Sequence, residues 1–250
     1  MTEARGGDGG RRIAVVIPAW NEAAAIGAVV REIPRALVAE VIVADGGSTD
    51  GTREAASAAG ARVLDAGRGY GRACALGAAA APAGCDVIAF MDGDGADRAD
   101  FLPLLARPIL DGTHDFAIAS RTRGAREPGS MNWHQLLAGR LAGGAMGALY
   151  GVRYSDMCAF RAIRREALAR LAMRETTYGW NIEMQMKAAR AGLRILELPV
   201  PYRRRAGGAS KVAGSLRGTL RAGSRIAATF ARVAASPPPR RPALDSPPAR

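Results

Sequence analysis

The sequence predicts one α/β domain with a mostly parallel, doubly wound central sheet. Short apolar segments alternate with helical ones through the first half of the chain, and a polar or Gly-rich cluster follows each apolar segment. Such alternation is typical of parallel sheets. The chain has 250 residues, of which 48% are hydrophobic, so it can bury the core of one domain. Ligands of such sheets bind beyond the carboxyl ends of the strands, where the polar clusters lie.

The predicted elements follow one another in regular order. We expect strands at Arg12–Ile17, Glu40–Ala44, Arg62–Asp65, Asp86–Met91, Ala117–Ser120 and Arg194–Pro199. We expect helices at Ala23–Ile33, Thr52–Ala59, Trp133–Ala148, Arg164–Leu171, Asn181–Ala191 and Val212–Val233, with an Ala-rich helix after the loop Gly67–Gly71. This order divides the chain into a disordered leader (1–11), a catalytic domain (12–211), an amphipathic helix (212–235) and a disordered tail (236–250).

The net charge of +12 is unevenly distributed. From Arg203 onward the chain holds 11 of its 35 basic residues but only one of its 23 acidic residues, so the body is nearly neutral and the C-terminal part is basic. Arg-rich tails can bind nucleic acid, but no aromatic residue follows Phe230 among these arginines. We therefore expect no nucleic-acid partner.

Three cysteines without a CxxC pair favour a reducing compartment over a disulfide scaffold or a zinc site. The segment Ala73–Cys85, the longest without a charge, is too short to span a bilayer, and no secretory signal is recognisable. The sequence predicts a cytoplasmic protein, soluble or peripheral on the inner face of the plasma membrane. A homo-oligomer is compatible with it.

Asp92-Gly93-Asp94 is the strongest candidate site. Two carboxylates separated by one small residue at a strand end can converge on one divalent cation, and oxygen ligands favour Mg²⁺ or Mn²⁺. Such a cation stabilises the negative charge of a departing nucleoside diphosphate. The competing interpretation is a solvated turn. A phosphatase with an Asp nucleophile would need a later lysine followed by an acidic pair, and neither Lys187 nor Lys211 has one.

Polar residues also follow the first two predicted strands. The Asp45 carboxylate could accept hydrogen bonds from a nucleobase or ribose, and Gly47 beside it permits close backbone approach. Asn21 and Glu22 have the same potential. The alternative for these residues is helix capping, by Ser48 or Asp50 in the second loop. No GxxxxGK[ST] motif is present, which excludes a P-loop.

Together these segments resemble family 2 glycosyltransferases. The order and spacing match at Val15–Glu22 (VVIPAWNE), Asp45–Gly51 (DGGSTDG), Arg68–Gly71 (RGYG) and Met91–Asp94 (MDGD). The second half resembles the polyprenyl- and dolichyl-phosphate mannose/glucose synthase branch at Ser155–Arg161 (SDMCAFR), Gly179–Gln185 (GWNIEMQ) and Arg205–Lys211 (RAGGASK). The chain departs from the branch in having Ala159 where glycine is usual and no spanning helix after the catalytic domain.

The resemblance implies a GT-A fold, a Rossmann-like three-layer sandwich, and an inverting transfer from a nucleotide-diphosphate sugar. It implies a nucleotide pocket that includes Pro18, Glu22, Asp45 and Arg68. It also implies cation and diphosphate binding at Asp92 and Asp94, and a basic loop over the phosphates with Arg205, Ser210 and Lys211. From the residues alone, Arg121 and Arg161 are further candidates for phosphate binding, with a surface role as the alternative for each.

The acceptor decides whether a general base is needed. A hydroxyl acceptor needs one opposite the leaving group, whereas a phosphate acceptor is already anionic. Asp156 and Glu183 are the candidates for this base, with Asp156 slightly favoured. The alternatives are a turn or cap for Asp156, and for Glu183 a salt bridge to Lys187 four residues later. The sequence leaves the choice open.

The predicted helix Val212–Val233 places apolar residues on one side and arginines on the other. This layout is typical of an interfacial helix on an anionic membrane, and equally of a helix packed on the domain. We expect an enzyme that moves a hexose, from a donor of the UDP-glucose or GDP-mannose type, to a polyprenyl phosphate or another membrane-associated acceptor. The alternatives are transfer to a soluble small-molecule or glycan hydroxyl, or a non-catalytic binding protein of the same fold.

Overall fold

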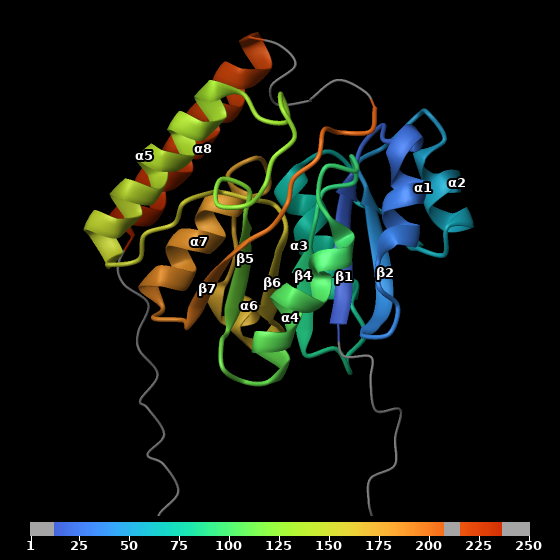
Figure 1. Ribbon diagram of the computed structural model, residues 1–250, viewed down its shortest axis with the longest axis horizontal. Helices are drawn as coiled ribbons and strands as arrows, with labels where there is room; N and C mark the ends of the chain where they lie inside the picture. Colours follow the sequence, from blue (N-terminus) through green and yellow to red (C-terminus); the bar gives the residue numbers. More distant parts are fainter. Residues whose placement is uncertain (1–12, 208–215, 237–250) are drawn as a thin grey trace, which may run out of the picture.

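The computed structural model describes residues 13–207 and 216–236. Its centre is a seven-stranded sheet in the order β3-β2-β1-β4-β6-β5-β7 (Figure 1). Only β6 runs antiparallel to its neighbours β4 and β5; the other neighbouring strands are parallel. This confirms the predicted α/β class with a mostly parallel sheet. The expected leader and tail, like residues 212–215 of the C-terminal helix, lie outside the described residues.

The strands are β1 (Ile13–Ala19), β2 (Val38–Asp45), β3 (Arg62–Asp65), β4 (Val87–Phe90), β5 (Phe116–Ser120), β6 (Arg161–Arg164) and β7 (Ile195–Pro199). The helices are α1 (Ala23–Glu32), α2 (Thr52–Ala58), α3 (Tyr70–Ala80), the 3₁₀ turn η1 (Ala99–Phe101), α4 (Leu102–Leu110), α5 (Trp133–Tyr150), α6 (Arg165–Leu171), α7 (Trp180–Arg190) and α8 (Leu216–Ala235). Most bounds lie within a few residues of those predicted.

The central strands are apolar along their whole length because helices cover both faces of the sheet. Four of the five residues Ile13–Ile17 are β-branched, and all five are fully buried. In Figure 1, α4 lies in front of the sheet and α3 behind it. Gly77 of α3 faces Val16 so closely that a Cβ would overlap the valine side chain. The small residues of α3 thus bring the helix directly onto β1.

Strand β6, helix α4 and the short turn η1 before α4 were not predicted from the sequence. Strand β6 has only four residues and two of them are arginines, so it lacks an apolar signal. Helix α4 contains Pro103 and Pro108, which disfavour a helix in isolation. Strand β1 runs two residues past its predicted end at Ile17 and so includes Pro18.

The structure also corrects the interpretation of Arg161. The sequence suggests that its side chain binds phosphate or lies on the surface. Its side chain is fully buried and donates hydrogen bonds to the backbone oxygens of Cys158 and Asn181. Because burial penalises the charge, the pKa of the Arg161 guanidinium is lowered. Arg161 therefore joins the core strands to α7 and takes no part in a surface site.

Helix α8 packs against α7 on the protein itself. Ala222, Thr229 and Val233 are buried, and Ile226 and Phe230 pack on the main core. The described part of the apolar stripe is therefore covered by protein, which is the packing alternative left open by the sequence. The Arg190 guanidinium of α7 donates to the backbone oxygens of Val233 and Ser236, closing the end of this contact.

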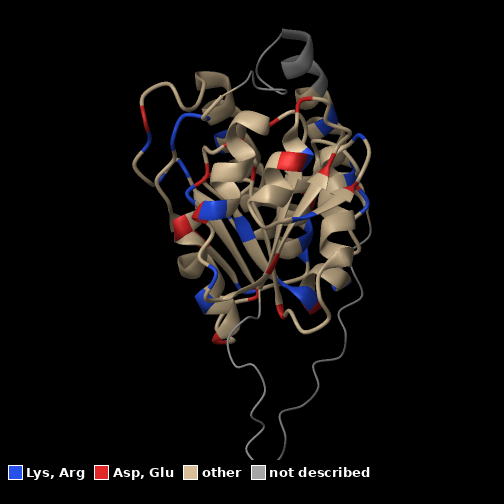
Figure 2. Cartoon of the chain, turned by 90° about the vertical axis from the view of Figure 1, so that its right-hand side faces the viewer, with Lys and Arg blue, Asp and Glu red and all other residues tan. Residues whose placement is uncertain are grey.

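Acidic and basic residues are interspersed over the domain (Figure 2), as expected for a nearly neutral body. Within residues 13–207 and 216–236, no helix has the length and apolar character needed to cross a bilayer.

Candidate active site

Three parallel strands end at the same edge of the sheet and bring the predicted site residues together. Asp45, the last residue of β2, is in register with Ala19, the last residue of β1. Phe90, the last residue of β4, lies two residues before Asp92, and its neighbour in register on β1 is Val16. The strand order reverses direction between β1 and β4, which is the place where ligands of doubly wound sheets bind.

The Asp45 carboxylate is fully buried and shapes the loop that follows it. It accepts hydrogen bonds from the backbone N–H groups of Gly47 and Ser48, both at 3.0 Å, and from Arg53 Nε at 2.6 Å. Burial raises the pKa of Asp45, but the hydrogen bonds from Ser48 and Arg53 outweigh it and hold the pKa below its usual value. Gly47 has a φ of 83°, in the left-handed region that glycine adopts without strain. The turn therefore requires glycine at this position.

The first two strand-end loops are held to each other by reciprocal hydrogen bonds. Asn21 N donates to Ser48 Oγ at 2.8 Å, and Thr49 N donates to Asn21 Oδ1 at 3.0 Å. Asn21 adopts a φ of 51°, which is uncommon outside glycine. The next residue, Glu22, donates its N–H to Thr52 Oγ1 at 2.8 Å. In the structure the Asn21 amide thus fixes the relative position of the two loops.

Arg68 and Trp20 close this side of the site. The Arg68 guanidinium carbon lies 3.6 Å from the centre of the Trp20 ring, in a cation–π contact, and the Arg68 side chain is exposed. Sequence reasoning did not select Trp20 as a site residue. An exposed guanidinium stacked on an indole is well placed to contact the nucleotide expected from the sequence.

Asp92 and Asp94, separated by Gly93, follow the end of β4, and a third carboxylate, that of Asp97, lies next to Asp92. Asp92 accepts a hydrogen bond from Tyr70 Oη at 3.2 Å, and its backbone N–H donates to Asp97 Oδ2 at 3.0 Å. Asp97 is only 4% exposed. Burial raises the pKa of both Asp92 and Asp97, and Asp94 raises each further through repulsion between like charges. This concentration of negative charge suits a cation.

The donor set at Asp92 and Asp94 fits Mg²⁺ or Mn²⁺. Both side chains offer carboxylate oxygens, the ligands that these hard cations prefer. In the described part of the chain, no three His, Cys, Asp or Glu side chains gather into a complete metal site. Because two carboxylates fill only part of the coordination sphere of Mg²⁺ or Mn²⁺, a cation held by them would keep positions open for the oxygens of a diphosphate.

Arg205 reaches across the site from the segment after β7. Its guanidinium donates to Glu22 Oε1 at 2.9 Å, and its Nη1 lies 3.6 Å from Asp94 Oδ2. The backbone supports this position, since Ala206 N donates to Asp94 O at 2.9 Å. The structure thus brings Glu22, Asp94 and Arg205 together. The other two members of the predicted clamp, Ser210 and Lys211, lie outside the described residues.

Arg121 and Asp156 form a buried ion pair on the other side of the acids. Arg121 Nε and Nη2 bind the two oxygens of Asp156 at 2.8 and 2.7 Å, and the backbone N–H groups of Arg121 and Met157 donate to the same carboxylate. Asp156 is 3% exposed. Burial raises its pKa, but Arg121 outweighs this and lowers the pKa below its usual value. Such a saturated carboxylate is a poor proton acceptor.

Glu183, the second candidate base, is equally engaged. It is 1% exposed, accepts hydrogen bonds from the backbone N–H groups of Arg174 and Glu175, and pairs with Lys187 Nζ at 3.0 Å. The salt bridge weighed in the sequence analysis is therefore present. Glu183 holds the loop 172–178, which is bonded to the start of α3, since Arg72 N donates to Thr176 O at 3.0 Å.

Tyr202 links the cation side of the site to the Arg121–Asp156 pair. Its backbone forms an isolated bridge to Asp97, and its ring lies 5.0 Å from the Arg121 guanidinium carbon. Sequence reasoning missed Tyr202, Asp97 and Tyr70. A signal existed for two of them: Asp97 is a third acid after the Asp-Gly-Asp segment, and Tyr70 lies within the Arg-Gly-Tyr-Gly segment.

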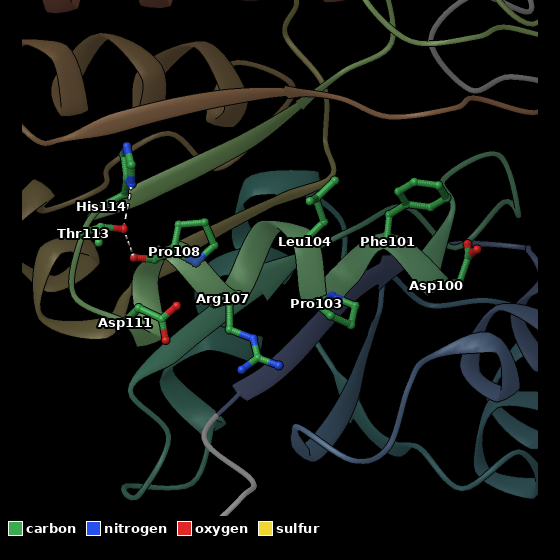
Figure 3. Close-up of a pocket in the computed structure, with 9 residues that line it drawn as sticks. All are labelled: Asp100, Phe101, Pro103, Leu104, Arg107, Pro108, Asp111, Thr113 and His114. Atoms are coloured by element: carbon green, nitrogen blue, oxygen red, sulfur yellow. Dashed lines mark hydrogen bonds between the residues drawn. The ribbon is translucent and has the colours of Figure 1, made fainter.

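A separate shallow hollow of about 700 Å³ runs along the outer side of α4 (Figure 3). Phe101, Leu104 and Pro108 are among its lining residues, and His114 lies at one end with its Nδ1 3.0 Å from Thr113 Oγ1. None of the predicted site residues lines this hollow. The chemistry-bearing groups lie at the strand ends instead.

Comparison with known proteins decides the family. The family model described as "Glycosyl transferase family 2" matches residues 14–172, more than half of the chain. The chain belongs to glycosyl transferase family 2. The family 2 assignment confirms the resemblance found in the sequence.

Two relatives and one solved structure are similar to this family 2 glycosyltransferase over most of its length. An uncharacterized glycosyltransferase of Mycobacterium tuberculosis is 35% identical over 217 residues, which are 84% of this chain and 94% of that protein. An undecaprenyl-phosphate mannosyltransferase of Micrococcus luteus is 30% identical over 227 residues, or 83% and 90% of the two chains. Glucosyl-3-phosphoglycerate synthase from M. tuberculosis, solved with Mn²⁺, UDP and glucosyl-3-phosphoglycerate, superposes with a TM-score of 0.71 at 26% identity, covering 91% of this chain and 81% of that one.

The family 2 chain is therefore an enzyme, a nucleotide-sugar-dependent glycosyltransferase with the GT-A fold. This confirms the expected fold and enzyme class and sets aside the non-catalytic alternative. The names of these relatives differ in their acceptors, a prenyl phosphate in one and a phosphorylated glycerate in another.

Proposed function

We propose that this glycosyltransferase moves a hexose from a nucleotide-diphosphate sugar to the phosphate of a polyprenyl lipid, with Mg²⁺ or Mn²⁺ held by Asp92 and Asp94. One observation carries the choice of acceptor: the two carboxylates that could serve as general base, Asp156 and Glu183, are buried and saturated by protein donors. An acceptor that already carries a negative charge needs no base.

The donor side of the proposal uses residues at the ends of β1, β2 and β4. Arg68 on Trp20 and the loop built by Asp45 and Gly47 would receive the nucleoside, and Asp92 and Asp94 would hold the cation. The cation, when bound, would stabilise the charge that develops on the leaving diphosphate. The cation would also compensate the charge of Asp94, and Arg205, which stays paired with Glu22, would add positive charge beside the diphosphate.

In the proposed reaction an oxygen of the acceptor phosphate attacks the anomeric carbon of the sugar. The new carbon–oxygen bond forms as the bond to the diphosphate breaks, and the nucleoside diphosphate leaves with the electron pair. No proton has to be removed from the acceptor. Attack opposite the leaving group inverts the anomeric centre. The protein's task is therefore positioning and charge compensation.

The acceptor proposal is tested by offering both phosphate chemistries to one enzyme preparation. The purified full chain is incubated with UDP-glucose or GDP-mannose, Mn²⁺, and either undecaprenyl phosphate in detergent or 3-phosphoglycerate, and products are identified by mass spectrometry. We expect a hexosyl phospholipid and no sugar on the glycerate. Transfer to the glycerate hydroxyl alone would refute the lipid acceptor and support the reaction named for the solved glucosyl-3-phosphoglycerate synthase.

A further inference from the structure

Helix α5 is built with its small residues inward. Of its 18 residues the buried ones are Gly139, Gly143 and Met146. A Cβ on Gly143 would overlap the backbone oxygen of Tyr154, and Gly147 packs on Arg153. The glycines therefore let the helix axis approach the segment 153–155, which leads directly to Asp156.

The large apolar side chains of α5 face away from the protein. Trp133, Leu137 and Leu141 stand at successive positions i, i+4 and i+8, on one side of the helix, and their exposed fractions are 75%, 47% and 65%. Gly144 and Ala148 continue this exposed side, and Leu149 near the end of the helix is 54% exposed. A helix of a soluble domain normally buries its leucines, so this outward face indicates a surface that meets an apolar partner.

The charges around this face identify the partner. Helices α5 and α8 both pack against α7, and neither contains an acidic residue. Among their described side chains, Arg140 on α5 and Arg225 on α8 are exposed, while Arg232 pairs with Glu175. A second copy docked through the same face would set arginines against arginines. An anionic lipid surface attracts them and accepts tryptophan and leucine at the boundary between headgroups and acyl chains.

We propose that the outward face of α5, formed by Trp133, Leu137, Leu141 and Leu149, docks the enzyme on an anionic lipid bilayer. This inference rests on the proposed lipid acceptor for its purpose, but its physical basis is the exposed face itself. The opposite side of α5 contacts the segment that leads to Asp156, so docking through α5 would bring the bilayer next to the Arg121–Asp156 side of the site. The inner face of the plasma membrane, expected from the sequence, is consistent with this partner.

Vesicle flotation tests the inference independently of any transfer reaction. The probes are vesicles of phosphatidylcholine alone and of phosphatidylcholine with phosphatidylglycerol, without prenyl lipid, nucleotide or metal. We expect the full chain to float with the anionic vesicles only, and less as salt rises. In the double variant L137Q/L141Q, the partition coefficient between water and anionic vesicles should fall by about tenfold or more.

A matched control removes two leucines that are exposed to a similar degree elsewhere. Leu76 on α3 and Leu104 on α4 have exposed fractions of 43% and 44%, and L76Q/L104Q should float like the wild type. A blue shift of tryptophan emission on vesicle addition should also disappear in Trp133→Phe. All variants change exposed side chains, so their melting temperatures should match the wild type and report on folding.

Two results would overturn the inference. One is flotation of L137Q/L141Q equal to that of the wild type. The other is an absence of vesicle binding together with a dimer, seen by light scattering, that L137Q/L141Q converts to a monomer; the face would then be a contact between copies. Loss of transfer to every prenyl phosphate with flotation intact would refute the proposed function alone.

Discussion

Thr229 of helix α8 donates its hydroxyl hydrogen to Glu175 Oε2 at 2.8 Å, and through this bond the C-terminal helix holds the loop 172–178. Arg232 Nη2 binds the same oxygen at 2.8 Å. Glu175 and Thr176 in turn press their backbone oxygens against Gly71 and Gly69, where a side chain would overlap them. Helix α8 therefore supports the segment that carries Arg68 and Tyr70, although it lies far from them in sequence.

The first prediction concerns this bond. Thr229→Val keeps the shape of the side chain but leaves Glu175 with one donor fewer, so we expect the free energy of unfolding to fall by about 1–2 kcal/mol. The donor KM should rise because the loop against Gly71 loses support. The control is Ser236→Ala, which removes an exposed hydroxyl from the end of the same helix. Equal effects of the two changes on KM would disprove the coupling.

The second prediction separates an ion pair from a general base. Asp156→Asn leaves the Arg121 guanidinium, 18% exposed, without its carboxylate, and we expect a loss of about 3 kcal/mol in the free energy of unfolding. Arg121→Lys should also destabilise, since lysine cannot form the bidentate pair. Urea denaturation measures both. If Asp156→Asn keeps full stability but transfers no sugar, Asp156 is a base after all.

The third prediction assigns Asp97 to positioning. Its carboxylate receives the N–H of Asp92, and asparagine can still accept that bond through its amide oxygen. We expect Asp97→Ala to weaken Mn²⁺ binding about tenfold or more, and Asp97→Asn to retain most of the affinity. Calorimetric titration with Mn²⁺ gives both constants. An equal loss in the two variants would show that Asp97 is itself a ligand.

The fourth prediction tests the close packing of α5 with two neighbouring glycines. Gly143→Ala places a methyl group against the Tyr154 oxygen and should destabilise the protein by about 2 kcal/mol or more. At Gly144 nothing lies within 4 Å of the added carbon, and alanine should stabilise the helix by up to about 1 kcal/mol. Thermal melts of both variants decide this. Similar shifts would mean that α5 does not pack on segment 153–155.

Much of the fold could be predicted because its signals are local. The parallel strands carry continuous apolar runs, and the strand-end clusters at Asp45 and Asp92 lie where the alternation of elements places them. Strand β6 could not be predicted, because its four residues are stabilised by pairing with β4 and β5 on both sides. Helix α4 needed its contacts with the sheet to offset its two prolines.

The site residues could be predicted as a set, but the state of each depended on contacts between distant segments. Asp156 looked available in the sequence, whereas Arg121, 35 positions earlier, occupies it. Likewise, the pairing of Arg205 with Glu22 joins segments 183 residues apart. The exposed side of α5 also required the structure, because a helix of small residues and leucines gives no sequence signal for which side faces the protein.

The central claim is that a divalent cation on Asp92 and Asp94 drives transfer from a nucleotide sugar. The most direct measurement is release of nucleoside diphosphate from UDP-glucose and GDP-mannose by the wild type and by Asp94→Asn, with Mn²⁺ and after chelation. We predict release with one donor only, its loss on chelation, its recovery on adding Mn²⁺, and a fall of about a hundredfold or more in Asp94→Asn with an unchanged melting temperature. Turnover that persists under chelation, or that survives in Asp94→Asn, would contradict the account.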